Sequence, residues 1–251
     1  MTALRGLAIA ALLAAAWQAL VWLAATPPYI LPGPGRVASA WWIHRATLLD
    51  HAGTTVIEIL LGLLIGAALG VLSALVLAHF RTARGWLLPV LVVSQALPVF
   101  ALAPVLVLWL GYGLASKVAM AVLIIYFPVT ATFYDGLRRT DAGWLDLAAT
   151  MGASRFSALV RIRVPAALPA LASGAKVAAA VAPIGAVVGE WVGSSAGLGY
   201  LMLHANGRMQ IDLMFAALVT LAVAAIAIYF AVDKLARAAL PWLPETGPGP
   251  D

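Results

Sequence analysis

Glu58 and Glu190 are the most informative side chains, because each is a carboxylate inside a long apolar stretch. An ionisable group in such a stretch faces a partner, a cavity or a transport pathway, or it extends to the membrane interface. Gln95 and Pro98 add a polar amide and a backbone break to a third apolar stretch. We predict that Glu58, Gln95, Pro98 and Glu190 line a translocation pathway, with snorkelling of the two carboxylates as the alternative.

The sequence contains no arrangement typical of metal binding or of a nucleotide-hydrolysing enzyme. The histidines lack helical ligand spacing with a carboxylate; they are His44, His51, His79 and His204. The absence of cysteine excludes thiolate metal sites and disulfides. No Gly-x-x-x-x-Gly-Lys phosphate loop occurs. We therefore expect interfacial histidines, no metal, and no cofactor bound by this chain.

Two other classes of protein are weighed against a transport subunit. Ser194 and Ser195 with His204 raise the possibility of an intramembrane serine protease. That enzyme needs a serine and a histidine facing each other within the membrane, whereas these residues lie on one predicted loop. An autonomous channel or carrier is the other class, but carriers usually show two related halves. Residues 1–125 and 126–251 show no internal repeat.

The composition is typical of an integral helical membrane protein. Of the 251 residues, 64% are hydrophobic and only 10% are charged, against about 25% charged residues in a soluble domain. The mean hydropathy is +1.01. The net charge of +5 fits the excess of Lys and Arg in cytoplasmic loops, so no nucleic-acid partner is expected.

The apolar residues fall into runs of roughly 20, the length that a membrane-spanning helix needs. Six spans are predicted, at about 5–25, 54–80, 86–110, 115–135, 171–192 and 213–235. Gly62, Gly66 and Gly70 form a small-xxx-small face that predicts close helix packing, within the chain or across a dimer. Residues 241–251 are predicted to be a disordered tail. The whole chain is thus expected to be one all-α transmembrane domain.

The distribution of basic residues predicts the orientation. If the N-terminus lies inside, most Lys and Arg residues fall in inner loops, including Arg81, Arg84, Arg138 and Arg139. Lys117 then falls in an outer loop. The bias predicts a multi-pass protein of the cytoplasmic membrane with both termini in the cytoplasm.

The loop at 136–170 is too polar to span a membrane and is predicted to form two short amphipathic helices. Asp141 and Ser154 are placed to cap them, and Gly152 is placed to end the first in the left-handed conformation. Pro165 and Pro169 are expected to stop the second helix. The loop is either a docking element for a partner or a solvated segment on the membrane surface.

This loop resembles the EAA loop of binding-protein-dependent ABC importer permeases. The similarity covers 146–155, with two alanines and a glycine three residues later, and the distal Leu-Pro at 168–169. The resemblance implies a coupling helix that contacts an ATP-binding subunit. The residues that it assigns to coupling are Asp146, Leu147, Ala148, Ala149, Met151, Gly152, Ala153, Ser154, Arg155, Phe156 and Pro165. Leu147 stands where the family usually has Glu.

The resemblance extends over nearly the whole chain and implies the type I ABC importer permease fold. It also implies the partners: two copies of an ATP-binding subunit that carries ATP and magnesium, an extracytoplasmic solute-binding protein, a second permease copy and the lipid bilayer. This chain is then a transport subunit and not an enzyme.

Three segments favour one branch of the family. They are the setting of Glu58, the segment 94–98, and 189–191 followed by 197–200. These are similar to permeases for hydroxymethylpyrimidine, a thiamine precursor, or for riboflavin. The alternative is an importer of alkanesulfonate, taurine or nitrate. Residues 30–34 resemble the outer-loop signature of the whole group, pyrimidine-type permeases included.

Overall fold

The computed structural model of the chain describes residues 2–242, apart from the side chains at 2–5, 7, 81, 92, 95 and 96. The predicted tail at 241–251 therefore lies almost wholly outside the described residues. Within residues 2–242 all regular structure is helical. The elements are α1 (Thr2–Leu23), α2 (Pro34–Ile43), α3 (Arg45–His79), α4 (Arg81–Ala96), α5 (Val99–Leu110), α6 (Leu114–Arg138), α7 (Ala142–Thr150), α8 (Arg155–Ala158), a π-helical turn (Leu159–Arg163), α9 (Val164–Gly193), α10 (Leu198–Gly207) and α11 (Ile211–Ala239).

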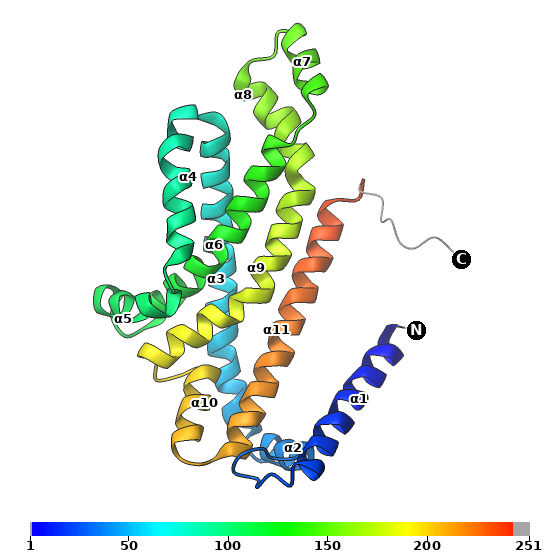
Figure 1. The fold of residues 1–251 in the computed structure, drawn as a ribbon, viewed down its shortest axis with the longest axis vertical. Helices are drawn as coiled ribbons and strands as arrows, with labels where there is room; N and C mark the ends of the chain where they lie inside the picture. Colours follow the sequence, from blue (N-terminus) through cyan, green and yellow to red (C-terminus); the bar gives the residue numbers. More distant parts are fainter. Residues whose placement is uncertain (1, 243–251) are drawn as a thin grey trace.

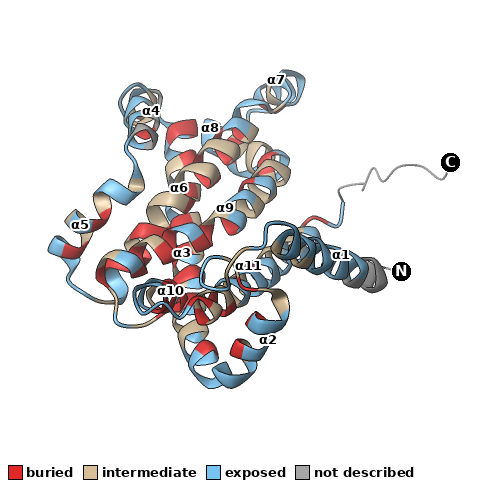
Figure 2. Ribbon diagram, turned by 60° about the horizontal axis from the view of Figure 1, so that its bottom comes forward, coloured by how far each residue is buried: buried red, intermediate tan, exposed pale blue. Residues whose placement is uncertain are grey.

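The centre of the fold is a bundle in which α6 packs between α3 and α9 (Figure 1). The predicted small-residue face on α3 makes the first of these contacts. A Cβ atom added at Gly66 would lie 2.8 Å from Cγ2 of Ile125, and one added at Gly70 would lie 3.0 Å from Cβ of Val129. The glycines therefore allow close approach within one chain, against α6. Buried residues gather along these helices, whereas α1, α4 and α5 are largely exposed (Figure 2).

The prediction of about six membrane helices is confirmed in outline. Four helical stretches of the described chain are long and apolar enough to cross a membrane: Arg45–His79, Leu114–Arg138, Arg155–Gly193 and Ile211–Ala239. Two shorter apolar helices, Ala8–Leu23 and Val99–Leu110, account for the first predicted span and part of the third.

The predicted third span at 86–110 is divided between α4 and α5, so the backbone break expected at Pro98 is confirmed. The chain breaks between α4 and α5, where Leu97 is extended (φ −80°, ψ 121°) and Pro98 follows. The ring of a proline disfavours the helical conformation in the residue before it, and proline has no N–H to continue the helix. Pro89 and Pro104, by contrast, lie inside α4 and α5.

The helix α1 stands apart from the bundle (Figure 1). It meets the rest of the chain at its C-terminal half, where the ring of Trp17 lies 5.9 Å from that of Phe215 in α11. Leu12, Leu13 and Trp22 are exposed. Apolar side chains on a helix with few contacts in its own chain are typical of a surface covered by lipid or by another protein.

Two short helices occupy connections that the sequence analysis left as loops. Pro34, at the first turn of α2, has the fixed φ that a helix start requires. The helix α10 buries Leu198, Leu201 and Met202 in a core cluster with α2 and α11. This packing stabilises a helix of ten residues that would be marginal alone.

Candidate functional site

Residues 141–163, comprising α7, α8 and the π-helical turn, project from one end of the bundle (Figure 1). We call this segment the knob. Its predicted caps are confirmed: the Asp141 carboxylate accepts a hydrogen bond from Gly143 N at 2.7 Å, and Ser154 Oγ accepts one from Ser157 N at 3.1 Å. Gly152 has φ +77°, so the predicted left-handed turn between the helices is also confirmed.

The prediction that Pro165 and Pro169 stop the second helix is wrong. The chain runs from α8 through the π-helical turn into α9, and both prolines lie within α9. Pro165 needs no backbone donor where it follows the wider π turn, because one intrahelical hydrogen bond is already omitted there. The knob is therefore joined to a membrane-spanning helix by continuous helical backbone.

The knob presents apolar side chains to its surroundings. Trp144, Leu147, Met151 and Phe156 are all exposed, with Met151 at 79% and Leu147 at 61%. A hollow of about 480 Å³ lies between α7 and the following helical segment, lined by Trp144, Leu147, Met151 and Gly152 among others. An exposed apolar group of this kind indicates a docking surface.

Most of the predicted coupling residues lie in the knob and are exposed. Asp146, Leu147, Ala149, Met151, Gly152, Ser154, Arg155 and Phe156 are exposed, as is Pro165 at the base; Ala153 is half-buried and Ala148 is buried. Their contact with an ATP-binding subunit stays a prediction.

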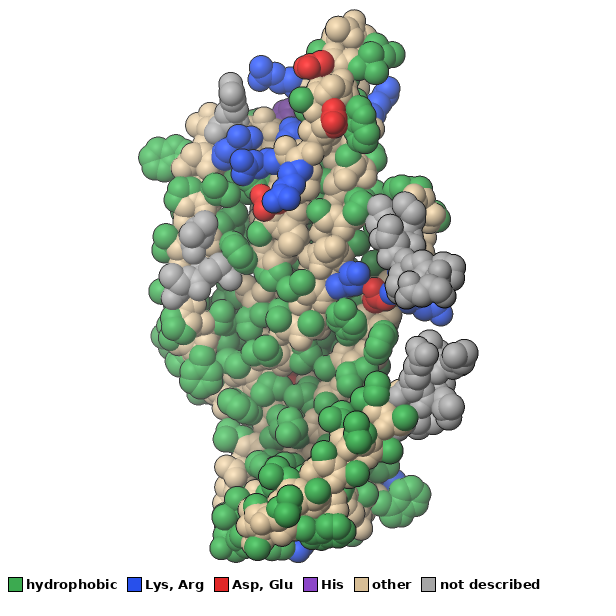
Figure 3. All heavy atoms as spheres, turned by 45° about the vertical axis from the view of Figure 1, so that its right-hand side comes forward, with side chains coloured by type: hydrophobic (Ala, Val, Ile, Leu, Met, Phe, Trp, Pro, Cys, Tyr) green, Lys and Arg blue, Asp and Glu red, His purple; other side chains and the backbone are tan. Residues whose placement is uncertain are grey.

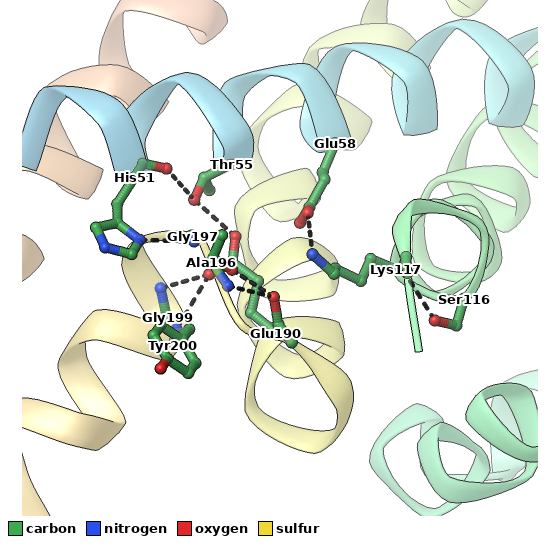
Figure 4. Close-up of polar contacts among 12 residues, drawn as sticks. His51, Thr55, Glu58, Ser116, Lys117, Glu190, Ala196, Gly197, Gly199 and Tyr200 are labelled. Atoms are coloured by element: carbon green, nitrogen blue, oxygen red, sulfur yellow. Dashed lines mark hydrogen bonds and ion pairs between the residues drawn. The ribbon is translucent and has the colours of Figure 1, made fainter. Parts of the chain in front are cut away.

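At the opposite end of the bundle, Glu58 is paired with Lys117 (Figure 4). The Lys117 Nζ donates to Glu58 Oε1 at 2.8 Å, and the two residues are 6% and 0% exposed. The placement of Lys117 in an outer loop is therefore wrong: it lies in the first turn of α6, where α3 and Gly189 of α9 close over it. Two isolated opposite charges in separate apolar stretches were the signal for this pair.

Glu190 of α9 holds the start of α10. Its Oε1 accepts a hydrogen bond from Thr55 Oγ1 at 2.6 Å, and its Oε2 accepts from the backbone N–H groups of Gly199 and Tyr200. A carboxylate at a helix N-terminus satisfies donors that have no partner within the helix, and it interacts favourably with the helix dipole. Thr55 Oγ1 also accepts from Leu198 N at 2.8 Å.

His51 completes this arrangement, which we call the polar network. It comprises His51, Thr55, Glu58, Lys117, Glu190 and residues 197–200, which are the N-cap and first turn of α10. The His51 Nδ1 accepts from Gly197 N at 2.9 Å, and Gly197 has φ +109°. Figure 4 shows His51 and Thr55 of α3 and Glu190 of α9 pointing toward the start of α10, whereas Lys117 of α6 points toward Glu58. The network thus ties four helices together.

The two buried carboxylates do not snorkel, since Glu58 is 0% exposed and Glu190 is 1% exposed. Of the other pathway candidates, Pro98 lies at the break between α4 and α5, outside the polar network. The side chain of Gln95 lies outside the described part of the chain. That these four residues line a pathway stays a prediction.

Neither metal binding nor serine catalysis finds support in the described residues. Within them, no group of three His, Asp or Glu side chains could hold a metal ion. Ser194 Oγ bonds to the backbone of Ala196 in its own loop, and the His204 ring lies 4.0 Å from that of Tyr200.

Comparison with known proteins shows similarity to ABC transporter permeases. Residues 62–243 match the family model described as "Binding-protein-dependent transport system inner membrane component". The chain is 56% identical over 232 residues to a probable ABC transporter permease protein of Haemophilus influenzae, covering 92% of this chain and 95% of the relative.

Two relatives with named solutes are each 37% identical. One is the formylaminopyrimidine transport permease protein ThiX of Halalkalibacterium halodurans, with 86% of each chain covered. The other is the riboflavin transport system permease protein RibX of Chloroflexus aurantiacus, with 90% of this chain and 85% of the relative covered. Among solved structures, a chain of the inward facing MetNI methionine ABC transporter matches with a TM-score of 0.59 and 21% identity, over 78% of this chain and 96% of that chain.

Proposed function

Because the chain belongs to the family of binding-protein-dependent transport system inner membrane components, we propose that it forms the pathway of an ABC importer for a solute with a pyrimidine ring. The family and the type I permease fold make it an importer permease subunit. The solute is then a hydroxymethylpyrimidine-type thiamine precursor or riboflavin, moved inward across the cytoplasmic membrane.

The choice of solute is supported by the two relatives with named solutes at 37% identity. A formylaminopyrimidine and riboflavin share a pyrimidine ring, which in riboflavin is fused into the flavin. Alkanesulfonate, taurine or nitrate is the alternative class, because sulfonate and taurine permeases also match the chain. Nitrate is a small anion, and alkanesulfonates and taurine carry an ionised sulfonate group but no pyrimidine ring, so a direct uptake assay separates the two classes.

The knob carries the coupling part of the proposal. Its exposed Trp144, Leu147 and Met151 would bind a groove of the ATP-binding subunit, in a homodimer of permeases with two ATPase copies. ATP and magnesium would be held by that subunit. Both termini and the knob would face the cytoplasm, and the solute-binding protein would approach the opposite end.

The continuous helix from α8 through α9 supports a mechanical role. Movement of the docked knob would pass along α9 to Glu190, which holds α10 through Gly199 and Tyr200. Glu58 and Lys117 join α3 to α6 in the same region. We therefore expect α3, α6 and α9 to tilt as a nearly rigid unit that opens the pathway alternately to each side.

Gly152→Pro tests the coupling role of the knob. Proline fixes φ near −65°, whereas Gly152 has φ +77°, so α7 cannot keep its direction relative to α8. We expect solute uptake to fall at least about tenfold, a loss of about 1.4 kcal/mol in coupling free energy, while the protein still inserts. Uptake and ATPase activity are measured in proteoliposomes that contain the whole importer.

The matched control is Gly85→Ala, because Gly85 lies in α4 with open space around it. This variant should transport like the unmodified protein. Normal uptake by Gly152→Pro would disprove the coupling role.

The solute is tested by uptake of radiolabelled hydroxymethylpyrimidine, riboflavin and taurine, each with its own binding protein, through the same permease. Saturable, ATP-dependent uptake of a pyrimidine or flavin supports the proposal. Uptake of taurine alone would replace it with the sulfonate class.

A further inference from the structure

A second pocket, of about 410 Å³, lies between the knob and the corner where α3 ends and α4 begins. Its polar side chains are His79, Arg84, Arg155 and Arg163, and the rest of its lining consists of alanine and leucine side chains. We call it the basic pocket. Its three arginines come from α4, α8 and the π-helical turn, so a ligand in the pocket would touch elements far apart in the sequence.

The positive charge in the basic pocket is not neutralised by any carboxylate of the described residues. No carboxylate lines it, and none of the four salt bridges among the described residues includes these three arginines. Arg163 Nε donates to the backbone oxygen of Leu137 at 2.9 Å. Arg84 Nε is buried without a hydrogen-bond partner among the described residues.

Tyr134 lies beside Arg84, outside the lining of the basic pocket, and it also has a buried polar atom without a partner among the described residues. Its hydroxyl is buried and has no partner among the described residues, and the guanidinium groups of Arg84 and Arg138 lie 5.8 and 5.6 Å from its ring. Burial of polar groups without partners costs free energy. An anion with several acceptor oxygens in the basic pocket would give Arg84 the acceptor that it lacks among the described residues.

The pocket lies where an apolar helix leaves the membrane. The span of α3 ends at His79, Phe80 follows it, and Trp86 is 78% exposed two residues after Arg84. Exposed aromatic rings beside basic residues mark the level of lipid headgroups. Lys and Arg side chains gather on this end of the molecule, below α7 (Figure 3).

We propose that the basic pocket binds a phosphate group, supplied by the headgroup of an anionic phospholipid at the knob end of the protein. Guanidinium groups bind phosphate oxygens through paired, charge-assisted hydrogen bonds, and basic pockets between membrane helices accept anionic headgroups. The bound phosphate links Arg84 of α4 to Arg155 and Arg163 at the base of the knob. It thereby restrains the knob against the α3–α4 corner.

Native mass spectrometry of the full chain, extracted with the subunits that it retains, measures this binding. Phosphatidylglycerol is titrated against phosphatidylcholine, and inorganic phosphate is titrated in a separate arm. We expect phosphatidylglycerol to bind about tenfold more tightly than phosphatidylcholine. Arg84→Gln should lower that affinity about tenfold, the effect of about 1.4 kcal/mol, and Arg84→Lys should lower it less.

The matched control is Arg139→Gln, which removes an exposed arginine at the same end of the chain but outside the pocket. It should bind phosphatidylglycerol like the unmodified protein. If Arg84→Gln does not fold, Arg84→Lys and Arg163→Gln carry the test.

Equal binding by the Arg84 variants and the unmodified chain would overturn the proposal, as would an equal loss in Arg139→Gln. If inorganic phosphate binds with the same dependence on Arg84 and phosphatidylglycerol does not, the phosphate site stands and its lipid source is wrong.

Discussion

At one end of the bundle Lys117 and Glu58 meet at 2.8 Å with almost no exposed surface, whereas at the other end Arg84 Nε is buried with no partner among the described residues. In the polar network one carboxylate oxygen, Glu58 Oε2, is also buried without a hydrogen-bond partner among the described residues. The other carboxylate oxygens of the network, on Glu58 and Glu190, accept hydrogen bonds from the same chain.

This difference indicates that the polar network stabilises the fold, whereas the knob end is a binding surface. Polar groups of the network satisfy one another inside the chain, so they hold helices together. The knob end leaves the apolar side chains of Leu147 and Met151 exposed and the arginines of the basic pocket without carboxylates. Within the described residues these groups have no partner of the complementary kind, so an external partner would stabilise them.

Lys117→Met is expected to have the largest effect on stability. It leaves the carboxylate of Glu58 buried and unpaired, and removal of one partner from a buried ion pair costs about 3–5 kcal/mol. The unfolding free energy is measured in mixed micelles. The control is Arg36→Gln, which breaks the exposed pair between Arg36 and Asp212 and should cost less than about 1 kcal/mol.

The double variant Glu58→Gln with Lys117→Met sharpens this test. With both charges removed, most of the lost stability should return. If Lys117→Met and Arg36→Gln are equally stable, the buried pair is no more important than the exposed one.

Gly185→Ala is expected to have an intermediate effect. The added Cβ would lie 2.7 Å from Cα of Ala121, a backbone atom of α6 that cannot move without separating α6 from α9. Overpacking of this kind costs about 1–3 kcal/mol, to be measured as a lower melting temperature in detergent. Gly53→Ala is the control, because Gly53 has open space around it. An unchanged melting temperature of Gly185→Ala would show that α6 and α9 can accommodate the added methyl group without loss of stability.

Leu147→Ser is expected to have the smallest effect on stability, within about 0.5 kcal/mol, because the side chain is 61% exposed. Its affinity for the ATP-binding subunit should fall about tenfold, since an apolar contact is removed from the proposed interface. Pull-down with the purified ATPase measures this. Leu235→Ser, an exposed leucine on α11, is the control and should bind normally. A large loss of stability in Leu147→Ser would mean that the knob surface serves the fold.

The local features of the knob could be predicted from the sequence. Asp141 and Ser154 bond to backbone groups two and three residues away, and Gly152 needs only its own freedom to reach φ +77°. The continuation of α8 into α9 was missed, because a π-helical turn before Pro165 is a rare solution that the local sequence does not specify.

Only part of the polar network could be predicted from the sequence. Glu58 and Glu190 stood out as charges in apolar stretches, but their partners lie far away along the chain. Lys117 is 59 residues from Glu58, and Thr55 is 135 residues from Glu190. The helix α10 was missed for the same reason, since its first N–H groups bond to a carboxylate of α9.

The sequence by itself determined the apolar helices, because the hydrophobic effect acts on each stretch of residues according to its own composition. It also determined the caps and the glycine turn of the knob, which depend on contacts within a few residues. Only the tertiary structure decided that Lys117 is buried against Glu58, that Glu190 holds α10, and that Arg84 and Arg163 line one pocket. Those outcomes depend on which helices pack side by side, and electrostatic partners are chosen by distance in space and not by distance along the chain.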